Sequence, residues 1–158
     1  MKNDLKDLSN PKKYNNPISI NNQDANTLQQ MLSTMLLIRK AEQQLAWGKK
    51  NNLIGGPVHL GVGQEAIAVG VSQNLKKTDR VFGGHRSHSH LLALNSNFYK
   101  LFAEVLGKDT GFSKGMGGSM HLYDQPNGFY GSVPIVAGTV PLAVGAAMAA
   151  KMQKTDDI

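Results

Sequence analysis

The residues best suited to chemistry lie in one short stretch, 79–90, which reads Asp-Arg-Val-Phe-Gly-Gly-His-Arg-Ser-His-Ser-His. Val81 and Phe82 predict a short apolar strand that breaks at the following glycine pair, and the leucines after the last histidine predict a helix. A strand that ends in glycine and passes cationic side chains to a helix is typical of an α/β ligand crevice. Backbone amides at a helix start and a nearby guanidinium favour a bound anion, most often phosphate. We therefore interpret the stretch as the diphosphate end of a cofactor site.

The cationic side chains of this stretch allow other interpretations. His85, His88 and His90 have a His-x-x-His-x-His spacing that offers three imidazoles to a metal ion. A single short segment rarely wraps a metal, and no nearby carboxylate or cysteine completes the set, so an anion site is favoured and no metal ligand is assigned. His90 lies beside three leucines, where a core histidine is the favoured interpretation. Arg86 follows the glycine pair, which is the position expected of an anion clamp.

Further polar candidates lie in glycine-rich loops. His59 and His121 are each compatible with a hydrogen bond that tethers a loop and with proton transfer in a catalytic site. Ser119 and Ser132 have no triad that the sequence identifies, and a nucleophile elbow (G-x-S-x-G) is absent. Hydrolase chemistry therefore has weak support.

The composition limits the class of protein. The 158 residues are 41% hydrophobic and 18% charged and include no cysteine, which excludes disulfides and thiolate metal sites. No apolar run approaches the roughly 20 residues of a membrane span, and the polar N-terminus does not resemble a secretory signal. The net charge of +6 arises from scattered lysines without a basic stripe, which disfavours nucleic acid. We expect a cytoplasmic protein that binds neither nucleic acid nor membrane.

The chain is predicted to comprise a tail and one domain. Residues 1–26 are rich in Asn, Lys and Asp and bury too little apolar surface to offset ordering, so a flexible tail is expected. Residues 27–158 form the domain, which opens with a helix to about Lys50, capped by Asn26 or Thr27. Further helices are predicted over 64–75, 98–106 and 142–153.

Two glycine-rich stretches, 110–120 and 131–138, are predicted to be irregular. The first has a backbone that can turn tightly or approach a ligand, but it lacks the P-loop pattern of nucleotide sites. The helix over 142–153 consists of Ala, Gly and small apolar residues and is expected to pack on several sides. Because Asp156 and Asp157 read as a turn into a new strand, we expect the chain to be part of a longer subunit.

Four motifs, in order along the chain, resemble a known family. They are Gly-Gly-Pro-Val-His-Leu-Gly-Val-Gly-Gln-Glu-Ala, His-Arg-Ser-His-Ser-His, Lys-Gly-Met-Gly-Gly-Ser-Met-His and Ile-Val-Ala-Gly-Thr-Val-Pro-Leu-Ala-Val-Gly-Ala-Ala. Together they closely resemble the alpha subunit of the thiamine-diphosphate-dependent first component of 2-oxo acid dehydrogenase complexes. Pyruvate, branched-chain 2-oxo acid and acetoin dehydrogenases belong to that family, and the resemblance covers about residues 28–158.

The resemblance implies an α/β fold that binds thiamine diphosphate, with a mostly parallel sheet flanked by helices, in an alpha-two beta-two tetramer. It assigns His85 and Arg86 to the diphosphate of the cofactor. The stretch from Pro134 through Ile135 to Val136 would meet the aminopyrimidine, with the valine as an apolar wedge behind a bent cofactor. A proline in this loop stiffens the backbone that must hold the cofactor.

The same resemblance assigns catalytic roles to His88 and His59. The magnesium-binding signature of the family is expected beyond Ile158, so magnesium is an expected cofactor without a ligand in this chain. We accordingly expect the chain to be truncated before that motif and to be inactive alone.

The implied reaction is oxidative decarboxylation of a 2-oxo acid, with pyruvate as first choice, and transfer of the acyl group to a lipoyl carrier. The implied partners are the beta subunit, the lipoyl-bearing acyltransferase core and the 2-oxo acid. Two alternatives remain open. One is an acetoin dehydrogenase with the same cofactor, and the other is a truncated, non-catalytic module that retains the subunit interface.

Overall fold

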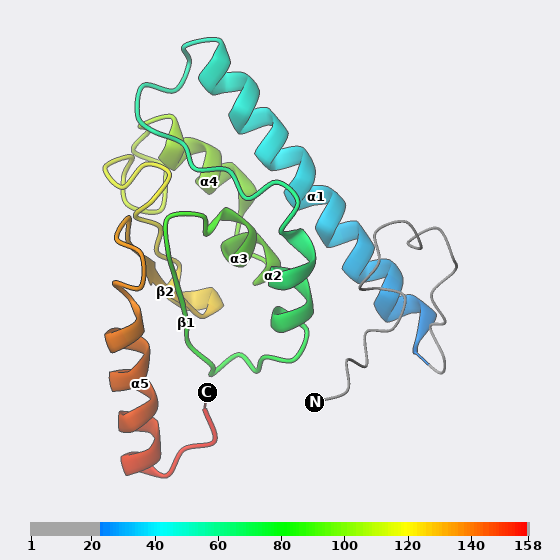
Figure 1. The fold of residues 1–158 in the computed structure, drawn as a ribbon, viewed down its shortest axis with the longest axis vertical. Coiled ribbons are helices and arrows are strands. Elements are labelled where there is room, and N and C mark those ends of the chain that lie inside the picture. The colour runs from blue at the N-terminus through cyan, green and yellow to red at the C-terminus, as the bar shows by residue number, and fades with distance from the viewer. Residues whose placement is uncertain (1–22, 158) are drawn as a thin grey trace, which may run out of the picture.

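The computed structural model describes residues 23–157, so the predicted tail lies largely outside the described residues. The elements in order are α1 Ala25–Lys50, α2 Glu65–Ser72, β1 Val81–Gly83, α3 His88–Ala93, α4 Phe98–Val105, the 3₁₀ turn η3 Gln125–Asn127, β2 Phe129–Ser132 and α5 Val140–Gln153. Figure 1 shows α1 as a long diagonal helix, with α2 and α3 beside it and α5 on the other side of the two strands. The prediction of an α/β fold is confirmed.

The first helix begins slightly earlier than predicted. The carboxylate of Asp24 accepts the N–H of Thr27 at 2.8 Å, so Asp24 is the N-cap in place of Asn26 or Thr27. The helix ends at Lys50 as predicted, and its last turn carries two lysines that complement the helix dipole. The predicted cap of α4 is confirmed, because the side chain of Asn97 accepts two backbone N–H groups of the first turn.

The described sheet consists of β1 and β2, which pair in parallel. Val81 lies opposite Phe129 and Gly83 opposite Ser132. The prediction of a wholly irregular stretch over 131–138 is therefore wrong at its start. The short strand escaped prediction because a glycine and a serine interrupt its apolar pattern, whereas its pairing with β1 depends on a distant segment.

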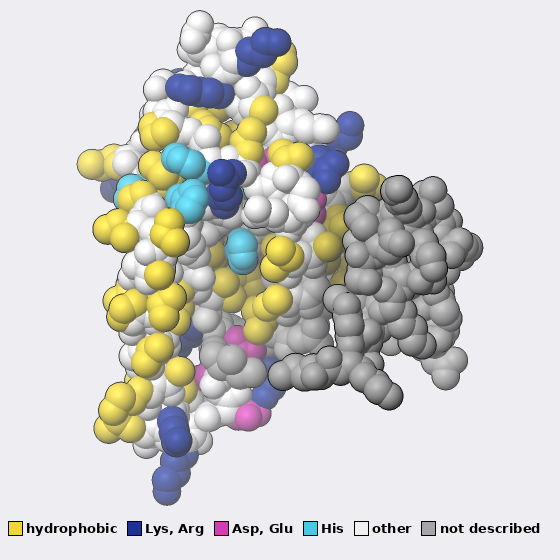
Figure 2. Space-filling view, viewed as in Figure 1, with side chains coloured by type: hydrophobic (Ala, Val, Ile, Leu, Met, Phe, Trp, Pro, Cys, Tyr) yellow, Lys and Arg dark blue, Asp and Glu magenta, His cyan; other side chains and the backbone are white. Residues whose placement is uncertain are grey.

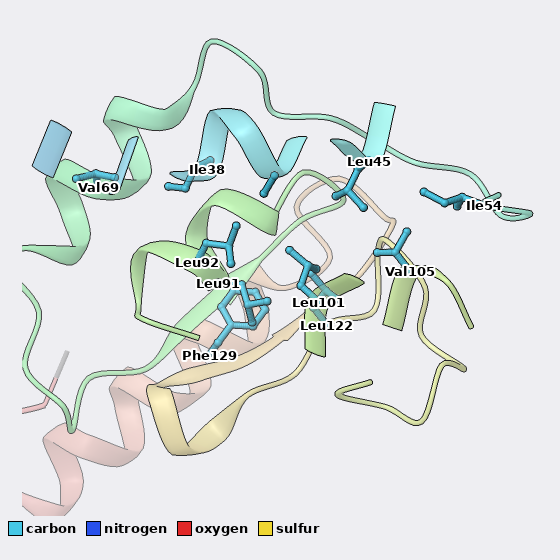
Figure 3. Packing of buried hydrophobic residues seen from close by; sticks show 11 residues of the cluster. Ile38, Leu45, Ile54, Val69, Leu91, Leu92, Leu101, Val105, Leu122 and Phe129 are labelled. Atoms are coloured by element: carbon cyan, nitrogen blue, oxygen red, sulfur yellow. The ribbon is translucent and has the colours of Figure 1, made fainter. Parts of the chain in front are cut away.

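The core lies where α1, α3, α4 and β2 meet, and Figure 3 shows its side chains converging. Its fully buried members include Ile38, Leu45, Leu91, Leu101 and Phe129. Burying each such side chain contributes about 1.5–3 kcal/mol. The core thus fixes α3, the helix that directly follows the candidate cationic residues.

The last helix, α5, was expected to pack on several sides, and within the described residues it does not. It contacts β1, and Ala150 is its single buried residue in the part of the chain described here. Leu142, Val144, Met148 and Met152 are all exposed, and Figure 2 shows a largely apolar surface at the lower left, where Figure 1 places α5. No helix within residues 23–157 combines the length and apolar character needed to cross a bilayer.

Candidate active site

The carboxyl end of β1 anchors two parts of the candidate site. The carbonyl oxygen of Gly83 accepts the N–H of Val133 at 3.3 Å and the hydroxyl of Thr139 at 3.2 Å. The loop 134–138 is therefore held at both ends beside the strand that leads into the cationic stretch. Gly83 avoids a steric clash, because a Cβ there would lie 2.7 Å from Cβ of Ser87 and 3.0 Å from the ring of Phe129.

Three of the predicted residues come together at this strand end. The rings of His59 and His85 meet edge to face, with centroids 5.2 Å apart. Arg86 donates a hydrogen bond from Nη1 to the carbonyl oxygen of Leu60, which holds the loop after α1 against the segment after β1. The guanidinium is exposed and the two imidazoles are half-buried. Figure 2 shows histidine side chains gathered on one face with a Lys or Arg side chain among them.

These groups are donors that suit an anion. A guanidinium presents a fork of N–H groups that matches phosphate oxygens, and imidazoles add further donors. Nδ1 of His59 is buried, and no described residue forms a hydrogen bond with it. Within residues 23–157, no group of three or more His, Cys, Asp or Glu side chains could hold a metal ion. The arrangement can therefore bind a phosphate group, and the described residues offer no cluster of carboxylates to a cation.

The loop 134–138, tied to the carbonyl oxygen of Gly83, presents an apolar surface. Pro134 is exposed, and Ile135 and Val136 are 70% and 77% exposed. Ala137 adopts a left-handed backbone conformation with φ 62°, which costs a residue with a Cβ about 1–2 kcal/mol. An exposed apolar pair on a strained loop could contact the flat face of a ring. The predicted cofactor stretch thus lies at the same strand end as Arg86.

His88 occupies a different environment, since it is 0% exposed. Its Nδ1 lies 3.1 Å from Oε1 of Glu42 in α1, and its Nε2 lies 2.9 Å from Oγ of Ser119. Nε2 also lies 3.1 Å from the backbone carbonyl oxygen of Ser119. Both ring nitrogens are therefore engaged inside the protein. In this structure, His88 links α1 to the loop that carries Ser119, and its catalytic role stays a prediction.

Glu42, His88 and Ser119 place a carboxylate, an imidazole and a hydroxyl in the same order as in a hydrolase triad. A nucleophilic serine must reach a substrate carbonyl, but Ser119 is 4% exposed. Its hydroxyl instead accepts the backbone N–H of His59 in a long bond of 3.4 Å. The network of Glu42, His88 and Ser119 therefore connects α1 to His59 and does not support hydrolysis.

Sequence reasoning missed the carboxylates that organise the site. Arg39 of α1 forms a two-pronged ion pair with Glu65 at the start of α2, with N···O distances of 2.6 and 3.0 Å. The hydrogen bond from Arg39 lowers the pKa of Glu65 from its ordinary 4.5 to about 2, although burial acts in the opposite direction. Glu42 falls between the buried residues Ala41 and Leu45 of α1. A charged residue on an apolar helix face was the signal that could have revealed it.

The two remaining histidines lie apart from these contacts. His90 is half-buried in α3, where burial lowers its pKa below the ordinary 6.5, and its Nδ1 lies 3.3 Å from the hydroxyl of Ser89. His121 is exposed, and its Nδ1 lies 3.3 Å from the carbonyl oxygen of Gly117, which is the contact of a loop tether. The structure gives neither histidine a place in the cationic group.

Comparison with known proteins extends these observations. A family model described as "Dehydrogenase E1 component" matches residues 33–158. The pyruvate dehydrogenase E1 component subunit alpha of Rickettsia prowazekii is 41% identical over 124 residues, which cover 78% of this chain and 38% of the relative. Its counterpart from Rhizobium meliloti is 40% identical over 124 residues, with 78% and 36% covered. The subunit alpha of acetoin:2,6-dichlorophenolindophenol oxidoreductase from Bacillus subtilis is 39% identical over 128 residues, with 81% and 38% covered. The match spans less than two fifths of each relative's length.

Proposed function

Because this chain belongs to the dehydrogenase E1 component family, we propose that it acts as the alpha subunit, in its N-terminal part, of a thiamine-diphosphate-dependent 2-oxo acid dehydrogenase. The proposed reaction is oxidative decarboxylation, with pyruvate as first substrate and a lipoyl group as acyl acceptor. One observation carries this proposal. Three contacts meet near the end of β1. Arg86 donates to the carbonyl oxygen of Leu60, and the rings of His59 and His85 are in contact. The carbonyl oxygen of Gly83 accepts hydrogen bonds from both ends of the apolar loop 134–138.

The residues present fit the cofactor. Arg86 and His85 would hold its diphosphate, because an exposed guanidinium and an adjacent imidazole supply the donors that phosphate oxygens require. Pro134, Ile135 and Val136 would support its pyrimidine ring, because they form an exposed apolar surface beside those donors. When bound, thiamine diphosphate supplies the electron sink for loss of carbon dioxide from a 2-oxo acid. The protein then contributes position, exclusion of water and proton transfer.

The two histidines predicted to be catalytic receive different roles. Nδ1 of His59 is buried without a hydrogen-bond partner among the described residues, so we propose that a bound ligand supplies that partner and that His59 exchanges a proton with it. His88 is fully buried with both nitrogens engaged, so we propose that it acts through Ser119. In that role it is a positioning residue, which keeps the loop with His59 in place through the serine hydroxyl.

The partners follow from the family assignment and from the exposed surface. A beta subunit is the proposed main partner, and the lipoyl-bearing acyltransferase core is the acceptor. Magnesium would complete the diphosphate site, and we assign it no ligand among residues 23–157, where no cluster of ligating side chains occurs. We propose a cytoplasmic location, since several of the similar proteins come from bacteria.

The proposal is tested by cofactor binding to the full tetramer of alpha and beta subunits. Arg86→Ala should weaken thiamine diphosphate binding about tenfold to a hundredfold, because hydrogen bonds to charged groups contribute about 1.5–3 kcal/mol. Isothermal titration calorimetry measures the change. Lys77→Ala is the matched control, since Lys77 is also exposed but precedes β1. An unchanged affinity for Arg86→Ala would contradict the proposed function.

A second function, cleavage of acetoin with the same cofactor, is favoured by the similarity to the Bacillus subtilis subunit. An assay of the complex with pyruvate, branched 2-oxo acids and acetoin separates the two substrates. The non-catalytic alternative predicts a stable complex with the beta subunit that binds no thiamine diphosphate.

A further inference from the structure

A buried carboxylate that plays no part in the proposed chemistry organises the glycine-rich loop 111–118. Glu104 lies in α4 between the core residues Leu101 and Val105 and is 0% exposed. A charge in this position is costly unless hydrogen bonds compensate it. The compensation comes from the backbone of the loop.

Four backbone N–H groups of the loop donate to the Glu104 carboxylate. They belong to Ser113 (2.6 Å) and Gly115 (3.1 Å) on Oε2, and to Gly117 (2.6 Å) and Gly118 (3.2 Å) on Oε1. Bonds of this kind, from an amide to an ionised acceptor, are roughly twice as strong as neutral ones. One side chain therefore determines the path of the loop.

The glycines of the loop occupy positions where the backbone folds tightly around the Glu104 carboxylate. A Cβ on Gly111 would lie 2.6 Å from Cα of Glu104, so the loop passes directly against the helix that carries the carboxylate. Gly115 has φ 75°, a left-handed conformation that glycine adopts without strain. The glycines thus allow the backbone to wrap around the carboxylate.

The loop delivers the next residue, Ser119, to the site. Its hydroxyl lies 2.9 Å from Nε2 of His88 and accepts the N–H of His59. We propose that Glu104 is a positioning residue of the thiamine diphosphate site, which acts through the loop and Ser119 on His88 and His59. This inference rests on the proposed function for the identity of the site, and on the hydrogen bonds for the connection.

The first experiment measures the loop in the 158-residue chain. Glu104→Gln replaces one acceptor oxygen by an NH₂ group that faces backbone donors, so amide hydrogen exchange within 111–119 should accelerate about tenfold or more. Trypsin should cleave faster after the exposed Lys114, with cleavage after the exposed Lys77, which lies outside the loop, as internal reference. Asp109→Asn is the matched control, because it removes an exposed carboxylate near the loop and should leave both rates unchanged.

The second experiment separates positioning from local structure. Nuclear magnetic resonance of the imidazole groups in the same chain should show shifted signals of His88 and His59 in Glu104→Gln and unchanged signals of His121. In Glu104→Ala, formate should restore slow exchange and the original signals by occupying the vacated acceptor position. Formamide, which has the same size but no charge, should not.

Three results would overturn the inference. They are an unchanged exchange rate in Glu104→Gln, a faster exchange with unchanged His88 and His59 signals, and equal rescue by formate and formamide. If Glu104→Gln does not fold, Ser119→Ala tests the connection without touching the carboxylate, and unchanged histidine signals would then refute it. An unaltered cofactor affinity of Arg86→Ala would contradict the proposed function alone, because the loop and histidine measurements need no cofactor.

Discussion

The two glycine-containing loops on either side of β2 are held in different ways. Loop 111–118 closes around Glu104, so four of its backbone donors find an acceptor inside the same chain. Loop 134–138 is tied at its ends to the carbonyl oxygen of Gly83 and leaves Ile135 and Val136 exposed. Loop 111–118 thus finds the acceptor for these donors within the chain, whereas loop 134–138 presents an apolar surface that a ligand or another subunit can cover. The exposed Ile135 and Val136 therefore distinguish the second loop, whose contact with a cofactor or a subunit stays a prediction.

The largest effect is expected where the first loop touches its helix. Gly111→Ala should lower the free energy of unfolding by about 3 kcal/mol, because the new Cβ would overlap the backbone of Glu104 and force the loop away. Urea denaturation of the chain measures the loss. Gly55→Ala is the control, since a Cβ there meets no atom within 4 Å. Equal stability of the two variants would show that loop 111–118 is not closed as described.

A smaller effect concerns Glu65, whose carboxylate accepts hydrogen bonds from the side chain of Arg39 and from the backbone N–H of Gly63. Between pH 4.5 and 2 the native state binds fewer protons at Glu65 than the unfolded chain, because the pKa of Glu65 is lowered to about 2. The stabilisation is therefore complete above about pH 4.5 and is lost as the pH falls toward 2. Glu65→Gln should unfold at a lower temperature at pH 7 and lose this part of the acid dependence. Thermal unfolding between pH 2 and 7 measures both, and parallel curves for the two proteins would contradict the ion pair with Arg39.

The smallest expected effect is a gain in the free energy of unfolding, and it concerns loop 134–138. Ala137→Gly should raise the free energy of unfolding by about 0.5 kcal/mol, because relief of the left-handed strain exceeds the added chain entropy of glycine. Ala147→Gly, in the middle of α5, should instead lower it by about 1 kcal/mol. Urea denaturation checks both changes. A destabilised Ala137→Gly would mean that the loop does not store this strain.

Much of the local structure could be predicted from short-range patterns. The apolar spacing in α1 and the cap at Asn97 act over a few residues, and both were recognised. The residues after β1 are predicted to be anion donors because glycine, histidine and arginine follow a strand directly, and that role stays a prediction. The start of β2 was missed, since its pairing partner lies in β1.

What the sequence determined by itself is the chemistry available to this protein, namely Arg86 and its neighbouring imidazoles after a strand, in a motif order shared with a family. Tertiary structure alone decided which histidine is buried and which faces outward, and that Glu42 and Ser119 meet His88 across 46 and 31 positions of the chain. The physical reason is the distance along the chain over which each kind of interaction acts. Turn chemistry and periodicity act between neighbours, whereas burial and the hydrogen bonds of a buried charge depend on packing between segments that the sequence keeps far apart.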